Sequence, residues 1–122
     1  MVRYIVQDDR AQAAKANRAI ALLTPEEPGF ISAIVLCELN WVLKSAYEIA
    51  KADCVTTLER ITAVSVFEIE HIDPCRRALR AYKEGTADFS DYLIREIALA
   101  SGCTGVLTFD KNALKADGFE KL

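Results

Sequence analysis

The sequence of 122 residues lacks the marks of several large protein classes. It has one histidine, and its four cysteines (Cys37, Cys54, Cys75 and Cys103) form no C-x-x-C pair and no cluster with it, which argues against a zinc site. Neither a P-loop nor a G-x-G-x-x-G motif is present, so a nucleotide cofactor is not supported. No apolar run reaches the length of a signal peptide or a membrane span. We therefore expect a soluble, cytoplasmic protein with cysteines buried as small apolar side chains.

The composition is that of a folded domain. Apolar residues make up 52% of the chain and charged residues 27%, which excludes a disordered chain. A chain of this length forms one domain, residues 1–122, with a core that needs no disulfide. The net charge of −3 argues against bulk electrostatic binding of nucleic acid, but it leaves room for a local basic patch.

Strand and helix patterns alternate along the chain. Turn residues and caps punctuate them: Ser32, Asp73 before Pro74, and Asp88 stand at helix starts, and Gly85 stands at a helix end. Strands are predicted over 2–6, 30–31, 65–69 and 105–109, and the last of them is expected to be buried. Helices are predicted over 10–23, 33–47, 52–63, 74–84 and 89–101, and a short helix is predicted before the terminal GFEKL. Asp8 or Asp9 is the expected cap of the first helix. The alternation predicts an α/β fold with a mostly parallel sheet flanked by helices.

Three acids occupy informative positions. Glu38 lies mid-helix between apolar neighbours at i±3 and i±4, where an unpaired carboxylate is costly, so it is either a ligand or a helix-edge residue that reaches solvent or an Arg. Asp110 follows a strand, as ligand-binding residues of open parallel sheets do, and it also fits a turn. Asp91 lies in the first turn of a helix, where it complements the helix dipole or pairs with Arg95.

Converging carboxylates repel one another unless a cation joins them, and their hard oxygen atoms select Mg²⁺ or Mn²⁺. Such an ion suits hydrolysis of a phosphodiester, since it activates water and neutralises phosphate charge. We expect Glu38, Asp91 and Asp110 to approach a common point, with Asp88 as an accessory acid whose simplest role is capping. The single histidine, His71, is more simply a residue at a strand edge than a catalyst.

A basic face is predicted on the helix over 74–84. Arg76, Arg80 and Lys83 share one side, whereas Cys75, Ala78, Leu79 and Tyr82 lie on the other. Three interpretations remain open: an ordinary solvated face, a surface that contacts RNA phosphates, and a surface for an acidic partner.

The chain resembles the PIN-domain ribonucleases, specifically the VapC-type toxins of bacterial toxin–antitoxin pairs. The stretches that carry the resemblance are VRYIVQDD, FISAIVLCELNWVL, ADFSDYLIREIA and VLTFDK, in family order over nearly the whole chain. The resemblance implies a PIN-like three-layer fold and an endoribonuclease that cuts RNA with Mg²⁺ or Mn²⁺ held by Glu38, Asp91 and Asp110. It also implies an antitoxin protein as partner and a homodimer.

One departure from the family leaves alternatives open. The family's first, central strand and its D-T-N with the first catalytic Asp have no counterpart before VRYIVQDD. We expect a truncated chain to be less stable than an upstream-extended form, unless residues 2–6 fill the vacant strand position and Asp8 or Asp9 approaches the site. A catalytically impaired module that only binds a partner is one alternative function. A receiver domain is another, although Asp53 follows helix-forming residues and Lys111 lacks a following Pro.

Overall fold

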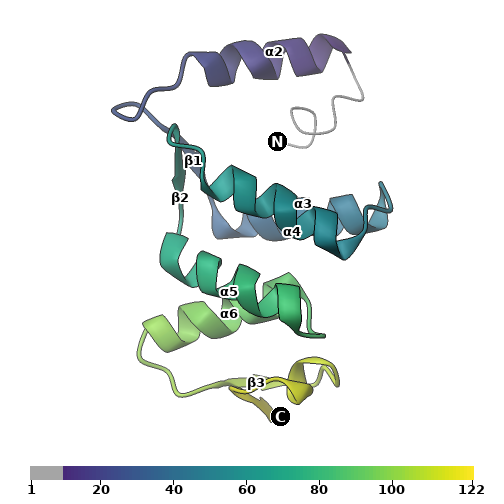
Figure 1. Cartoon of the computed structure of the whole chain (residues 1–122). Coiled ribbons are helices and arrows are strands. Elements are labelled where there is room, and N and C mark those ends of the chain that lie inside the picture. The colour runs from purple at the N-terminus through teal and green to yellow at the C-terminus, as the bar shows by residue number, and fades with distance from the viewer. Residues whose placement is uncertain (1–9) are drawn as a thin grey trace.

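The structure is a computed structural model that describes residues 10–122. Figure 1 shows α2 at one end of the molecule, the pair β3–β4 at the other, and the helices α3 to α6 between them. The elements in chain order are α2 (Arg10–Ala21), β1 (Gly29–Ile31), α3 (Ala33–Ser45), α4 (Lys51–Thr62), β2 (Phe67–Ile69), α5 (Ile72–Glu84), α6 (Phe89–Ala100), β3 (Val106–Thr108), the 3₁₀ helix η1 (Ala113–Lys115) and β4 (Phe119–Lys121). The predicted strand 2–6 and the predicted caps Asp8 and Asp9 lie outside the described residues.

The helix boundaries confirm most of the predicted start and stop signals. Ser32 caps α3, because its Oγ accepts a hydrogen bond from the Val35 N–H at 3.2 Å. The predicted start of α5 is wrong: the cap position belongs to His71, whose φ of 54° places it in the left-handed region, and Asp73 lies inside the helix. Gly85 follows α5 as expected, and its N–H donates to the Ala81 carbonyl at 2.8 Å.

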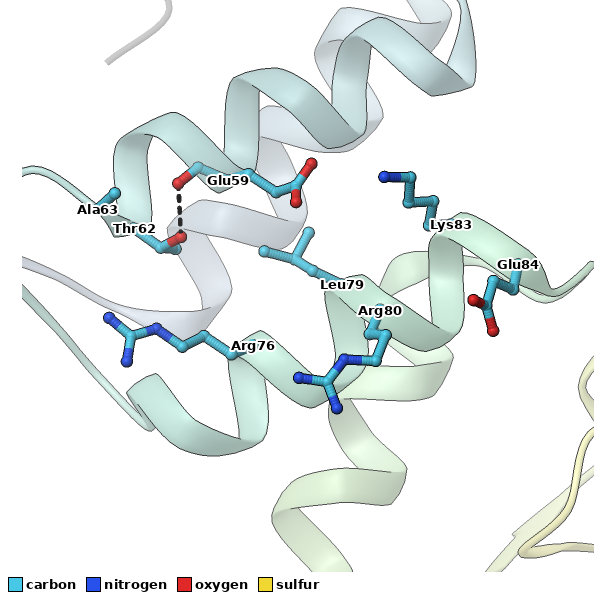
Figure 2. A pocket seen from close by; sticks show the side chains of 8 residues that line it. All are labelled: Glu59, Thr62, Ala63, Arg76, Leu79, Arg80, Lys83 and Glu84. Atoms are coloured by element: carbon cyan, nitrogen blue, oxygen red, sulfur yellow. Dashed lines mark hydrogen bonds between the residues drawn. The ribbon is translucent and has the colours of Figure 1, made fainter.

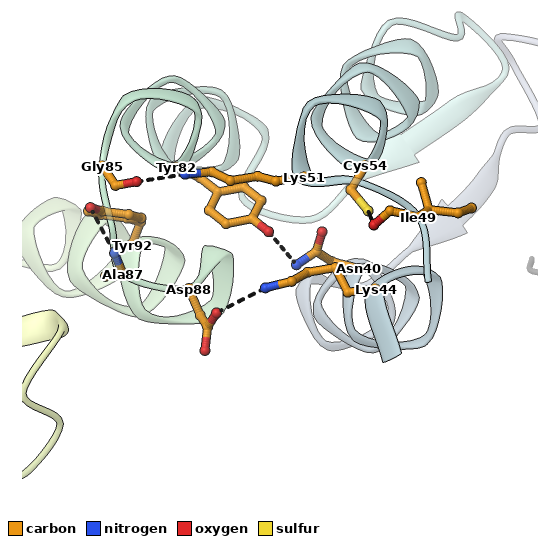
Figure 3. Close-up of polar contacts among 10 residues, drawn as sticks. All are labelled: Asn40, Lys44, Ile49, Lys51, Cys54, Tyr82, Gly85, Ala87, Asp88 and Tyr92. Carbon is orange, nitrogen blue, oxygen red and sulfur yellow. Dashed lines mark hydrogen bonds and ion pairs between the residues drawn. The ribbon is translucent and has the colours of Figure 1, made fainter. Parts of the chain in front are cut away.

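Four helices enclose the core. Helix α3 contacts α4, α4 contacts α5, α5 contacts α6, and α6 returns to α3, so the four form a closed square when viewed along their axes (Figure 3). Tyr82 projects into the middle of this square and its ring centroid lies 5.9 Å from that of Phe89. Leucines of three helices complete the packing, among them Leu36, Leu58 and Leu93, and each of these three is at most 2% exposed.

The strands are parallel, as predicted, but they form two small sheets instead of one. Strand β1 pairs with β2 in the register Gly29↔Phe67, and β3 pairs with β4 in the register Val106↔Phe119. No strand within residues 10–122 joins the two pairs, so each pair keeps an open edge.

Apolar residues at and directly after β3 are exposed. The strand predicted over 105–109 is not buried: Leu107 is 60% exposed, and Phe109 directly after β3 is 75% exposed. Burial of the cysteines is confirmed for Cys54 and Cys75 but is wrong for Cys103, which is exposed. Among the helices of residues 10–122, none is long and apolar enough to cross a membrane.

Candidate functional site

Asp88 stands at the N-cap position of α6, as predicted, but its side chain does not cap the helix. Its Oδ1 instead accepts a hydrogen bond from Nζ of Lys44 on α3, at 3.3 Å (Figure 3). Burial pulls the pKa of Lys44 down, but the neighbouring Tyr82 and Asp88 outweigh it and leave that pKa raised. The Asp88 carboxylate therefore ties the beginning of α6 to α3.

Asp91 lies in the first turn of α6, where the predicted pairing with Arg95 does not form. Arg95 turns instead to Glu96, with 3.1 Å between Nε and Oε2. Burial raises the pKa of Asp91, and the nearby charges of Asp110 and Asp88 raise it further, whereas a backbone hydrogen bond from Asp88 acts in the opposite direction. Asp110 and Asp88 thus lie close enough to act on the Asp91 carboxylate.

Asp110 comes two residues after the end of β3 and directs one oxygen atom to the backbone. Its Oδ1 accepts hydrogen bonds from the N–H groups of Asn112, at 2.8 Å, and Ala113, at 3.0 Å. Its own N–H donates to Oγ1 of Thr108 at 3.0 Å. The turn role considered for Asp110 is therefore confirmed, and it orients the carboxylate while the group stays exposed.

Glu38 lies on α3 in one of the two settings considered for it. It is exposed, and the apolar neighbours on its face, Ile34 and Trp41, are 68% and 67% exposed. Its exposure agrees with the interpretation of a helix-edge residue that reaches solvent, because nothing within residues 10–122 covers this face of α3. Glu38 is also not among the charges that act on Asp91.

The donor chemistry of the acids suits a hard divalent cation, because carboxylate oxygens are what Mg²⁺ and Mn²⁺ prefer and because the charges around Asp91 repel one another. As the side chains of residues 10–122 lie, however, no group of three or more His, Cys, Asp or Glu is placed to hold a metal ion. The structure relates Asp91 to Asp110 and Asp88 through their charges, and the complete set with Glu38 stays a prediction.

A pocket of about 260 Å³ opens beside Asp88 between α3 and α6. Its lining includes Cys37, Asn40, Trp41, Lys44 and Ser90. Nδ2 of Asn40 donates to the hydroxyl of Tyr82 at 3.4 Å, whereas its Oδ1 is buried without a partner within the described part of the chain. Asn40 was not among the residues expected at the site, although an Asn between leucine and tryptophan in mid-helix is a detectable signal.

Thiol chemistry is not favoured here. Burial raises the pKa of Cys37 and of Cys54, and it raises that of Cys75 to about 11. At neutral pH these groups are thiols, which are weak nucleophiles. His71 is exposed at the start of α5, beyond the end of β2, which agrees with a residue at a strand edge.

The predicted basic face is confirmed as exposed. Arg76, Arg80 and Lys83 lie at the surface of α5, whereas Ala78 and Tyr82 on its other side are buried. These cations line a groove between α4 and α5, separate from the acids of α6.

Comparison with known families gives one match. The PIN domain family matches residues 1–118. No curated protein and no solved structure matches the chain. PIN domains are generally nucleases that use divalent metal ions and act on RNA. The order of helices and short parallel strands agrees with the fold of this family, and the match covers nearly the whole chain. The chain therefore belongs to the PIN domain family.

Proposed function

We propose that the chain is a metal-dependent endoribonuclease and the toxin of a toxin–antitoxin pair. The observation that carries the proposal is that Asp110, after the end of β3, and Asp88, at the start of α6, both lie close enough to Asp91 for their charges to raise its pKa. Carboxylates that repel one another at the carboxyl end of a strand favour binding of a divalent cation. Membership of a family of nucleases supports phosphodiester hydrolysis as the reaction.

Each acid has a distinct role in the proposed site. Asp91 and Asp110 would hold Mg²⁺ or Mn²⁺, with Glu38 as the third ligand and Asp88 as the accessory acid. The ion, when bound, would polarise the phosphate and lower the pKa of an attacking water. The chain itself orients Asp110 through the N–H groups of Asn112 and Ala113, and it positions Asp88 through Lys44.

The proposed partners follow from the resemblance to VapC-type toxins. They are an RNA substrate, an antitoxin protein and a second copy of the chain, in the cytoplasm. The exposed apolar side chains Ile34 and Trp41 beside Glu38 support a protein partner on this side of α3, because exposed patches of this kind mark protein contacts.

The test compares Asp91→Asn with the unmodified chain in cleavage of a structured RNA, with Mg²⁺ and with EDTA. Asp73→Asn is the matched control, since Asp73 lies in the first turn of α5 just as Asp91 lies in the first turn of α6. Both substitutions remove the same stabilising interaction with a helix dipole. We expect Asp91→Asn to lose Mg²⁺-dependent cleavage at least a hundredfold, as removal of one charge-stabilising group does in other enzymes, and Asp73→Asn to retain it.

A module that binds without cleaving is the second candidate. It is favoured by the lack of an assembled metal-binding group within residues 10–122. If the unmodified chain and Asp91→Asn gave the same RNA products at the same rate with Mg²⁺ and with EDTA, the cleavage would not come from these acids. The binding function would then replace the nuclease.

A further inference from the structure

A groove of about 730 Å³ runs between α4 and α5, and we call it the α4–α5 groove. Figure 2 shows it with the last turns of α4 on one side and α5 on the other. Helix α5 contributes most of its lining, including three cations. The lining residues are Glu59 and Thr62 from α4, Ala63 directly after it, and Arg76, Leu79, Arg80, Lys83 and Glu84 from α5.

The three cations of the groove have no ion-pair partner within residues 10–122. Arg77, on the same helix, instead donates from Nε to Oε1 of Glu96 at 2.9 Å. Arg76, Arg80 and Lys83 follow one another at i, i+4 and i+7, and at ~1.5 Å per residue they extend about 10 Å along the helix. Unpaired cations in a row retain their full attraction for a polyanion.

Two carboxylates in the groove decide which cations are available. The Glu59 carboxylate points toward Lys83, and Glu84 lies beside Lys83 in the last turn of α5 (Figure 2). The Arg76 guanidinium lies toward the other end of the groove, away from both acids. The Arg80 guanidinium lies between Arg76 and Glu84 in this view, and it forms no ion pair within residues 10–122. Guanidinium is planar and can donate two hydrogen bonds to one phosphate, which makes arginine the preferred residue for phosphate recognition.

The position of the groove limits what it can contact. In the square of helices, Asp88 lies at the edge formed by α3 and α6, whereas α4 and α5 form the opposite edge (Figure 3). Two packed helices measure about 20 Å across. A ligand in the groove therefore leaves the acids free, and an RNA that reaches both edges must be long or folded.

We propose that the α4–α5 groove binds the phosphate backbone of the RNA substrate through Arg76 and Arg80, at a distance from the acids. This proposal rests on the proposed ribonuclease function and specifies its substrate class. The substrate is a structured or extended RNA that passes around the helices, and a short oligonucleotide that reaches only Asp88 and Asp91 gains nothing from the groove.

The experiment measures RNA binding in EDTA, so that no cleavage is required. A hairpin RNA of about 30 nucleotides is titrated against the unmodified chain and Arg76→Gln/Arg80→Gln, from 50 to 200 mM salt. Loss of two phosphate contacts lowers the slope of log K against log salt by roughly 1.4 to 1.8. Between these salt concentrations the unmodified chain should therefore lose roughly seven- to twelvefold more affinity for the hairpin than the variant loses.

The matched control is Lys15→Gln/Arg18→Gln, which removes the same charge from exposed positions of α2. It should leave the slope for the hairpin unchanged. Two outcomes would overturn the proposal: an unchanged slope for Arg76→Gln/Arg80→Gln, or an equal drop for the control. An unchanged slope together with lost binding of a poly-glutamate peptide would assign the groove to an acidic protein instead. Failure of the nuclease function would appear separately, in the Mg²⁺ assay of Asp91→Asn.

Discussion

Arg95 should hold the C-terminal segment that carries Asp110, and its replacement by alanine tests this directly. From α6, Arg95 donates Nη1 to the carbonyl of Asp117 at 2.9 Å, and its guanidinium carbon lies 5.9 Å from the centroid of the Phe119 ring. Phe119 pairs with Val106 in the ladder of β3 and β4. Removing the Arg95 side chain therefore loosens both strands and, with them, Asp110.

The cost can be estimated from the contacts that disappear. Nε of Arg95 donates to Glu96, which is 7% exposed, and such a charged hydrogen bond is worth about 1.5–3 kcal/mol. The bond to the Asp117 carbonyl adds about 1 kcal/mol, and the aromatic contact about 0.5 kcal/mol more. Only the contacts with Asp117 and Phe119 reach the C-terminal segment, so about 1.5 kcal/mol of its local stability should be lost, which corresponds to roughly tenfold faster amide exchange in β3 and β4.

Arg77→Ala is the matched control, because Arg77 also binds Glu96, at 2.9 Å, but forms no hydrogen bond or ion pair with β4 within residues 10–122. Its side chain is 46% exposed, so its loss should cost about 1 kcal/mol and leave exchange in β3 and β4 unchanged. Hydrogen exchange monitored at the Val106 amide, which donates to the Gly118 carbonyl at 2.8 Å, distinguishes the two variants. Equal acceleration in both, or in neither, would refute the role of Arg95.

Three further predictions follow from single contacts. A Cβ at Gly85 would clash with the Tyr92 hydroxyl and lie 2.8 Å from its Cζ, so Gly85→Ala should cost about 1–3 kcal/mol in thermal unfolding, and less when combined with Tyr92→Phe; an equal cost in both backgrounds would contradict this. Ser32→Ala removes the cap of α3 and should lower the free energy of unfolding in urea by about 1 kcal/mol; an unchanged free energy of unfolding would contradict the stabilising role of the cap. The folded-state pKa of Asp91 is raised above its ordinary 3.8, so its contribution to stability without metal is fully present below that pH and is lost as pH rises through the folded pKa. The difference in free energy of unfolding between the unmodified chain and Asp91→Asn should follow this trend, and a difference that does not change with pH would contradict it.

Helices were predictable because their signals are local. The cap at Ser32 and the apolar spacing of α5 lie within a few residues of the structure they specify. The start of α5 was not predictable, because Asp73 before Pro74 is a strong cap signal and the left-handed turn at His71 overrides it. Strand pairing depends on residues far apart in the chain, so the division into two sheets left no trace in the local pattern.

The candidate site, like the fold, was predictable only in part. The proximity of Asp91 to Asp110 follows from the general placement of ligands at the carboxyl ends of strands. The sequence left open whether Glu38 is exposed, because apolar neighbours indicate burial only when another element covers them. Pairing of Asn40 with Tyr82 joins residues on two helices, and no spacing rule connects them.

The exposed position of Trp41 makes it an optical reporter of one side of the molecule. It is the only tryptophan of the chain, it is 67% exposed, and it lines the pocket that contains Asp88. Its fluorescence emission should already be red-shifted in the folded protein, so unfolding should change it little. A blue shift should occur when a ligand or partner covers the edge formed by α3 and α6, and RNA held only in the α4–α5 groove should leave the emission unchanged. One native fluorophore can thus distinguish occupancy of the two opposite edges without any label.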